Sequence, residues 1–491
     1  MREMLPSQLQ LGEIDIASIK FNPRSRDDIP QLLKGLQFLY ADKVVRDKVF
    51  SVLELLTPDD VSTKTGRPGM HWWKILVMGT LRLNLNWDYD RLLEMVNNHK
   101  TIREMLGHGI RDEDFQYNLQ SLKDNIKLFT PEILDKLNQL VVDAGHQFIK
   151  KEKEIMGRCD SFVVETNVHF PTDISLAFDA VRKVIQLISE LSFKLKLTLW
   201  RQSKYNIKQL KSLYRIAQKI KYSSSKDELK KELRFKEVRS AYKKYAEYAS
   251  ELIQKADSTL ELIGPQTCLK TINKEHDIEV YIAHANRQIE QITTRMIDNI
   301  KIPHSEKVFS IFQEHTEWIC KGKAGVPVEL GLRVCIMEDI NGFILHHNVM
   351  KKETDDQVAV RMVEETQGRF NNFEGCSFDK GFHSPKNQID LNTLLKNNVL
   401  PKKGRRNKEE LKRERSEDFK ASKRQHSAVE SAINALEVHG LDKCPDDGIK
   451  GFERYVALAV VSRNIQKLGS EIQKKEQKKA KREKKQYQLV A

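Results

Sequence analysis

The spacing of apolar residues predicts a helical block in the first third of the chain. From Trp72 to Leu83 the apolar residues recur at the spacing of one helix face. Another helix is expected from Thr130, where a Thr-Pro-Glu sequence supplies a cap and a first-turn proline. Residues 51–150 are therefore expected to form a small helical domain, preceded by a lead-in at residues 1–50.

The pattern changes to that of β-strands near Cys159. Cys159 to Val164 is a short β-type run, and residues 330–336 and 343–349 form two more on either side of an Asn-Gly pair. Asn-Gly is the strongest short-range hairpin signal, because both turn residues must accept a positive φ. The last two runs are therefore predicted to form an antiparallel hairpin.

A helix and a further strand follow this hairpin. A capping box at residues 354–357 starts the helix, and residues 375–378 form the strand. Residues 175–303, between the first two strands, have helical spacing and are expected to be an insertion. Without the insertion the order is strand, hairpin, helix, strand, and the crossover lets the fourth strand lie parallel to the first. This order predicts an α/β, RNase H-like core within residues 151–470, with a mixed sheet of a three-stranded antiparallel meander plus parallel strands.

Three carboxylates occupy the positions that carry chemistry in such a core. Asp160 lies on the first strand and Asp379 ends the fourth, so the predicted pairing makes them neighbours. Glu430 lies on a helix predicted over residues 423–437, on one face with His426. Three carboxylates so placed can hold two Mg²⁺ ions, with Mn²⁺ as a substitute, for phosphodiester displacement.

Three motifs resemble those of bacterial insertion-sequence DDE transposases. Arg158–Asp173 looks like the first acidic motif of that family, Ser377–Phe382 resembles the second, and Arg424–Glu430 resembles the third. The likeness of the catalytic part covers Arg158 to Gly469 apart from the insertion. The segment from Gly66 to Gly107 is similar to the N-terminal helical domain of the family. The sequence departs from the family in having no tyrosine before the basic residue of the third motif and in carrying its insertion unusually early.

The resemblance implies that Asp160, Asp379 and Glu430 are the catalytic, metal-binding triad of a transposase. Such an enzyme cleaves double-stranded DNA at the ends of an insertion sequence and transfers the freed 3′-hydroxyl to target DNA. Because it acts on two ends, a homodimer on DNA is expected. Two alternatives are an RNase H-like nuclease without strand transfer and a non-catalytic DNA-binding protein derived from a transposase.

The insertion contains a basic segment that favours DNA binding. From Lys194 to Lys221 the chain holds nine basic side chains and no acidic one. A solvated helix face usually mixes glutamate with lysine to form i,i+4 pairs, whereas an acid-free face suits a row of phosphates. Five of the basic residues step by three and four positions and are expected to form one stripe on a helix: Arg201, Lys204, Lys208, Lys211 and Arg215.

Other basic residues are candidates for phosphate contact close to the triad. Candidates of this kind are Lys380, His383, Lys402, Lys403, Arg424 and His426. In the helical domain, Arg67, Lys74 and Arg82 permit a DNA-reading function without requiring it. Glu165 is a candidate fourth ligand or a helper. His346 and His347 are expected on opposite faces of one strand, as structural or DNA-facing residues.

Composition and charge agree with a nucleic-acid partner. The 491 residues contain 83 Lys and Arg against 69 Asp and Glu, a net charge of +14, which favours a polyanion. No apolar run has the length of a membrane span, and the cysteines are scattered singly, so any metal would be held by oxygen. We therefore expect a cytoplasmic, nucleoid-associated bacterial protein that binds no membrane, with a basic C-terminal tail at residues 471–491.

Overall fold

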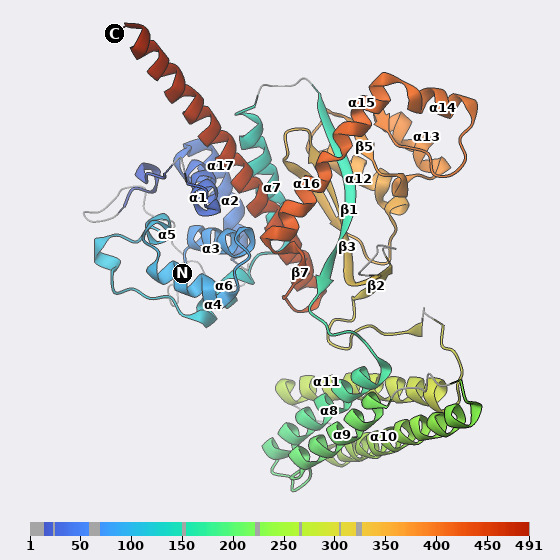
Figure 1. Cartoon of the computed structure of the whole chain (residues 1–491). Helices are drawn as coiled ribbons and strands as arrows, with labels where there is room; N and C mark the ends of the chain where they lie inside the picture. The colour runs from blue at the N-terminus through green and yellow to red at the C-terminus, as the bar shows by residue number, and fades with distance from the viewer. Residues whose placement is uncertain are drawn as a thin grey trace. The chain divides into compact units, whose positions relative to one another are not determined.

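The computed structural model describes residues 14–22, 25–57, 69–149, 154–220, 226–264, 268–303, 306–320 and 327–490. Arg67 and Lys221 lie outside the described residues. The chain divides into two compact units, which are described separately below (Figure 1). Residues 1–167 and 319–491 form the larger unit, and residues 168–318 form the smaller one. The helical segment predicted at residues 175–303 falls inside the smaller unit.

A mixed sheet of seven strands contains all the predicted strands. β1 pairs antiparallel with β3, β3 pairs antiparallel with β4, and β1 pairs parallel with β5. The predicted antiparallel meander and the parallel fourth strand are therefore confirmed. β6 extends the sheet beside β5, and β7 pairs parallel with the end of β1. The strands are β1 (Ile155–Thr166), β2 (Glu317–Cys320), β3 (Val328–Asp339), β4 (Ile344–Val349), β5 (Phe373–Phe378), β6 (Asn397–Val399) and β7 (Lys443–Cys444).

The helices of the larger unit share one hydrophobic core with the sheet. This core includes residues of the first helices, such as Leu36, together with Ile75 of the predicted helical domain and Ile336 of β3. The N-terminal helices are α1 (Asp28–Ala41), α2 (Lys43–Leu53), α3 (Trp72–Asn84), α4 (Tyr89–Asn98), α5 (Lys100–Met105), α6 (Leu119–Ile126) and α7 (Pro131–His146). The later helices are α12 (Asp355–Arg369), α13 (Pro385–Leu394), α14 (Lys408–Arg415), α15 (Glu417–His426), α16 (Ala428–Leu436) and α17 (Gly448–Val490).

The long helix α17 joins the N-terminal helices to the sheet (Figure 1). It crosses α1 at two glycines, since a Cβ on Gly35 would lie 2.1 Å from the Ile465 carbonyl oxygen and one on Gly469 would lie 1.9 Å from that of Gln31. Asn464 of α17 also donates to the backbone oxygen of Ile344 on β4 (2.8 Å) and accepts from its N–H (2.9 Å). These contacts satisfy buried backbone groups of β4, which would otherwise cost free energy.

Arg82, one of the candidate DNA-reading residues, is buried in an ion pair. Its guanidinium donates to Asp446 (2.9 Å) and lies over the ring of Tyr89, with 4.2 Å between the guanidinium carbon and the ring centroid. The Arg82 side chain is 5% exposed and that of Asp446 is 10% exposed. Arg82 therefore links α3 to the segment before α17 and does not face solvent, so the DNA-reading function that its charge permits does not use this side chain.

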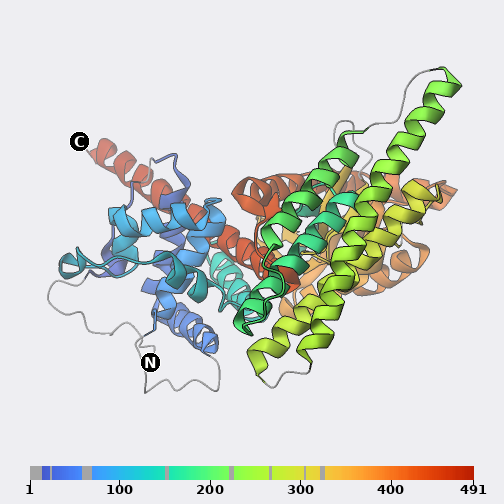
Figure 2. The ribbon, with the colours of Figure 1, turned by 90° about the horizontal axis from the view of Figure 1, so that it is seen from below.

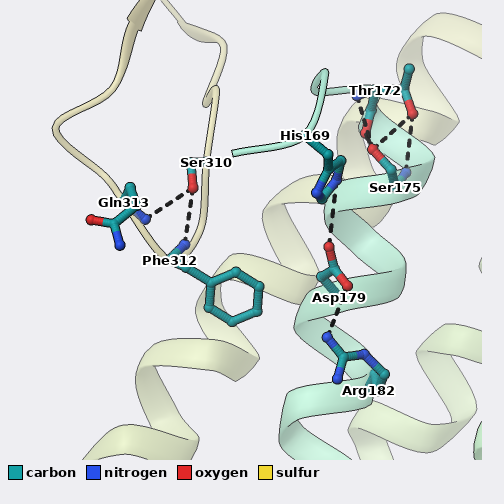
Figure 3. A network of polar contacts seen from close by, with 8 residues as sticks. All are labelled: His169, Thr172, Ser175, Asp179, Arg182, Ser310, Phe312 and Gln313. Atoms are coloured by element: carbon teal, nitrogen blue, oxygen red, sulfur yellow. Dashed lines mark hydrogen bonds and ion pairs between the residues drawn. The ribbon is translucent and has the colours of Figure 1, made fainter. Parts of the chain in front are cut away.

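The smaller unit is a bundle of long helices with its own core (Figure 2). Ile188 is fully buried in this core, and the indole N–H of Trp200 donates to Thr259 (3.0 Å). At the start of the bundle, Thr172 and Ser175 form a capping box, and the guanidinium of Arg182 donates a hydrogen bond to the carboxylate of Asp179 (3.0 Å; Figure 3). The helices are α8 (Asp173–Lys194), α9 (Ser203–Lys219), α10 (Glu228–Ile263) and α11 (Leu269–Ile292).

Two predicted helices differ from those observed. The helix predicted over residues 423–437 is interrupted at Ser427, whose hydroxyl donates to the carbonyl of Arg424 (2.8 Å) and so competes with the helical backbone bonds. The predicted basic stripe also included one residue outside the helix, because α9 begins at Ser203 and Arg201 precedes it. Four of the five stripe residues therefore lie on the helix. Within the described ranges, no helix has the length and apolar content that crossing a bilayer requires.

Candidate active site

The sheet brings Asp160 and Asp379 together. Asp160 lies on β1, and Asp379 is the first residue after β5. The two strands are parallel neighbours, and Cys159 pairs with Phe378, so each aspartate follows a paired residue. Although 219 positions separate the aspartates in the sequence, parallel pairing places them at neighbouring positions, Asp160 within β1 and Asp379 at the end of β5.

Glu430 reaches the same region from a helix. It lies in the first turn of α16, which packs against β1, while α15 packs against β5. The last residue of α15 is His426, whose ring Nδ1 lies 3.0 Å from the hydroxyl oxygen of Ser377 on β5. The interruption at Ser427 therefore separates the two candidate residues onto two short helices, and both helices contact the sheet beside the aspartates.

The carboxylates influence one another. Burial raises the pKa of Asp160 to about 6, and the charges of Asp379, Asp355 and Glu430 act in the same direction. The N–H of Ser161 opposes this change by donating to Asp160 (2.8 Å). Like charges disfavour the ionised form, so the site favours a cation that neutralises them.

The carboxylate oxygens of Asp160, Asp379 and Glu430 are suited to a hard divalent cation, but these side chains are not positioned to hold one ion together. In the described part of the chain, no Lys or Arg forms an ion pair with Asp160, Asp379 or Glu430. Nor do any three His, Cys, Asp or Glu side chains there stand close enough to hold one metal ion. All the candidate donors are carboxylate oxygens, which Mg²⁺ prefers. Binding an ion would therefore require at least one of these side chains to turn inward.

The structure adds Asp355 to this region, which the sequence pattern had assigned only to a helix start. Asp355 is the first residue of α12, and its Oδ1 accepts a hydrogen bond from the hydroxyl of Ser161 (2.6 Å). The sequence pattern did not single out Asp355, because acidic residues are common in the first turn of a helix. The sequence did contain one signal for Asp355: it begins the helix that directly follows the predicted meander, so it was expected near the strands.

His426 lies beside the carboxylates, and their charges influence its pKa. Burial lowers the pKa of His426, and Asp379 and Glu430 oppose this change while Arg158 adds to it. Arg158 is engaged by Glu338 on the neighbouring strand, with 3.3 Å between Nη1 and Oε2. Burial raises the pKa of Glu338 to about 7, against the opposing charge of Arg158.

The other candidates for phosphate contact differ in their availability. Lys380, Lys403 and Arg424 are exposed. Lys402 forms an ion pair with Glu410 (2.6 Å), which partly neutralises its charge. His383 is half-buried in the same neighbourhood, and burial lowers its pKa. Of the exposed candidates, Lys380 is next to Asp379 in the chain, and Arg424 lies on α15, which packs against β5.

In the smaller unit, the basic stripe is exposed and its charges are not matched by acids. Lys204, Lys208, Lys211 and Arg215 on α9, and Arg201 before it, are all exposed. Within the described residues, none of the five takes part in an ion pair, whereas α10 forms several along its own length, including Lys231–Glu228 (2.7 Å) and Arg234–Glu237 (2.7 Å). α9 therefore presents uncompensated positive charge, while α10 has an ordinary solvated surface.

Three further candidates lie away from the triad. Glu165 lies near the other end of β1, paired in register with Lys443 of β7. His346 and His347 contact acidic residues of different helices: His346 pairs with Glu365 of α12 (2.8 Å), and His347 lies 3.7 Å from Asp135 of α7. Both histidines line a polar cavity of about 540 Å³.

Comparisons with protein-family models, curated proteins and solved structures found no match to this chain.

Proposed function

We propose that this protein is a DDE-type transposase with an RNase H-like core, acting on the ends of an insertion sequence. The observation that carries the proposal is the position of Asp160 and Asp379 on neighbouring parallel strands, with Glu430 on a helix packed against the first of them. Carboxylates that gather in a basic chain without an ion-pairing Lys or Arg among the described residues are suited to binding divalent cations.

The sheet order supports the RNase H-like assignment. An antiparallel meander of β1, β3 and β4 is followed by the crossover helix α12 and by β5, which is parallel to β1. This arrangement is the expected opening of an RNase H-like core, with one aspartate on the first strand and one after the fourth.

Each side chain has a distinct role in the proposed mechanism. Asp160, Asp379 and Glu430 would hold Mg²⁺. When bound, a pair of Mg²⁺ ions supplies activation of the attacking water or 3′-hydroxyl and stabilisation of the leaving oxygen. His426, whose ring Nδ1 lies 3.0 Å from the Ser377 hydroxyl, would act as a hydrogen-bonding ring beside the phosphate. Lys380 and Arg424 neutralise phosphate charge near the site.

The basic stripe supports double-stranded DNA as the partner. Four of its exposed residues, Lys204, Lys208, Lys211 and Arg215, lie on one face of α9, and each phosphate that they neutralise would add a salt-dependent contribution to affinity. The net charge of +14 favours the same polyanion.

The direct test uses purified protein and a plasmid that carries the gene with its natural flanking DNA. We expect Mg²⁺-dependent nicking at the element ends, followed by products joined to target DNA. Asp160→Asn and Asp379→Asn should abolish both steps and retain DNA binding, while Asp390→Asn on α13 serves as a control that keeps activity.

The alternatives give different outcomes in this assay. Nicking without joined product would indicate an RNase H-like nuclease and not a transposase. DNA binding without Mg²⁺-dependent nicking would identify a non-catalytic DNA-binding protein. Cleavage that persists in Asp160→Asn would overturn the assignment of the triad.

A further inference from the structure

Two glutamates on one side of α14 are engaged by the turn that precedes the helix. Glu410 accepts from the ammonium of Lys402 (2.6 Å) and from the backbone N–H of Asn407 (2.7 Å). Glu414, four positions later, accepts from the backbone N–H of Lys402 (2.8 Å) and from Nε of Arg406 (2.6 Å). The turn is therefore folded against the acidic side of α14, and its own cations match the charges of both glutamates.

Three cations occupy a different side of α14. Lys408, Lys412 and Arg415 are separated by four and three positions, so they lie on one face, about 6 Å and about 4.5 Å apart along the helix axis. All three are exposed, and within the described residues none of them forms an ion pair. The exposed Glu409 is rotated by about 100° from its neighbour Lys408. This face of α14 therefore carries unmatched positive charge.

Helix stability does not account for this basic face. The helix macrodipole favours cations in the last turn, which explains Lys412 and Arg415. Lys408 is the first residue of α14, where the positive end of the dipole disfavours a cation. Lys408 and Lys412 also place like charges four positions apart, a spacing at which they destabilise a helix. The position of Lys408 therefore indicates a use other than stabilising α14.

α14 is held against the part of the sheet that carries Asp379. The guanidinium of Arg413 donates to the backbone oxygen of Leu400, just after β6 (2.8 Å), and lies over the ring of Phe419 on α15, 5.5 Å from its centroid. α15 in turn packs against β5 and β6, and Asp379 directly follows β5 (Figure 1). The basic face is therefore fixed to the elements that build the carboxylate site.

We propose that Lys408, Lys412 and Arg415 bind the phosphates of the duplex DNA that enters the carboxylate site, whatever the sequence of that DNA. This inference rests on the proposed function, because it takes duplex DNA as the substrate of that site. Lysine and arginine contacts to phosphates position a duplex but carry no sequence information. The larger unit thus holds DNA through cations of its own, in addition to those of α9 in the smaller unit.

The test is fluorescence anisotropy of the full-length protein in EDTA, so that the DNA stays intact, with two duplexes over a range of salt. One duplex comes from the natural flanking DNA of the gene, and the other has the same composition in scrambled order. Replacing Lys408, Lys412 and Arg415 by glutamine should weaken binding to both duplexes equally. The slope of log affinity against log salt should fall by about 3 units, if each side chain contacts one phosphate.

A matched control removes the same charge elsewhere in the larger unit. Lys396, Lys420 and Lys474 each form an ion pair with a glutamate, and replacing all three by glutamine should leave the slope unchanged. Lys408→Gln alone should lower the slope by about 1 unit. This single change removes a cation that the dipole disfavours, so the variant should melt at or above the temperature of wild type.

The outcomes separate this inference from the proposed function. An equal change of slope in the two triple variants, or no change in the α14 variant, would overturn the role of α14. A loss confined to the flanking sequence would contradict binding that is independent of sequence. If wild type shows no Mg²⁺-dependent nicking while the α14 variant alone loses affinity and slope, the transposase proposal is wrong and the α14 face stands as a DNA-binding surface.

Discussion

At the scale of single residues, burial and like charge set the chemistry of the site. Asp160 is half-buried on β1, and the charges of Asp379, Asp355 and Glu430 act on it in the same direction as burial. The N–H of Ser161, which donates to Asp160 (2.8 Å), favours the ionised form. Such a residue destabilises the metal-free fold when it ionises, and a bound cation would reverse that cost.

Asp160→Asn should therefore change the pH dependence of stability. The pKa of Asp160 rises from 3.8 to about 6 on folding, so its contribution to stability is present below pH 4 and is lost as the pH rises through 6. Without divalent cations, the variant should be more stable than wild type by about 3 kcal/mol above pH 7, and the difference should vanish below pH 4. Urea unfolding in EDTA at several pH values measures this, and a difference that stays constant from pH 4 to pH 8 would contradict it.

At the scale of elements, close contacts decide which helices can pack together. α1 and α17 approach so closely that neither Gly35 nor Gly469 has room for a Cβ. Asn464 then fixes α17 to β4 through two hydrogen bonds with Ile344. The helix therefore acts as a support between the N-terminal helices and the strand that completes the meander.

Gly469→Ala should destabilise the larger unit. The added methyl would lie 1.9 Å from a backbone oxygen of α1, so the two helices must separate, at a cost of about 1–3 kcal/mol. Gly368→Ala on α12 is the matched control, because nothing lies within 4 Å of its Cβ position and alanine favours the helix by about 1 kcal/mol. Denaturant unfolding of both variants should give effects of opposite sign, and equal effects would refute the role of close packing.

The basic face of α9 should control the salt dependence of DNA binding. Replacing Lys204, Lys208, Lys211 and Arg215 by glutamine should weaken binding and flatten the plot of log affinity against log salt by about 3 to 4 units of slope, if each contacts one phosphate. Four basic residues of α10 that form ion pairs provide the matched control: Lys231, Arg234, Lys236 and Lys243. Fluorescence anisotropy with duplex DNA over a range of salt tests this, and an equal change in both sets would count against the α9 face.

At the scale of the whole molecule, two separate cores organise the chain. One core joins the N-terminal helices to the sheet, and the other lies within the helical bundle of residues 168–318. A core that is shared among helices and strands unfolds as one cooperative unit, whereas separate cores can unfold independently.

Calorimetry should resolve this organisation. Ile75→Ala on α3 and Ile336→Ala on β3 should lower the same unfolding transition, because both residues are buried in the core of the larger unit. Ile188→Ala on α8 should lower a different one. Each change should cost about 2–5 kcal/mol. A transition that responds to Ile75→Ala and not to Ile336→Ala would show that the N-terminal helices form a domain of their own.

The sequence alone determined the pairing of four of the seven strands, β1, β3, β4 and β5, and the neighbourhood of Asp160 and Asp379. It did not predict β2, β6 and β7. The predicted features depend on local information: the alternation of apolar residues, the Asn-Gly turn at Asn341 and the capping box at Thr354. Once four strands and a crossover are placed in order, chain connectivity permits few pairings.

Only the tertiary structure decided which distant side chains meet. Arg82 bonds Asp446 across 364 positions, and Asp355 turns from a helix start toward Ser161, 194 positions earlier. The sequence pattern indicates that a residue is buried or charged, but a side chain's partner depends on how separate elements pack. A basic residue can therefore be exposed, where it is available to a phosphate, or buried against a carboxylate, as Arg82 is. Burial removes the charge from water, which costs free energy, so it occurs only where the packing supplies a partner such as Asp446.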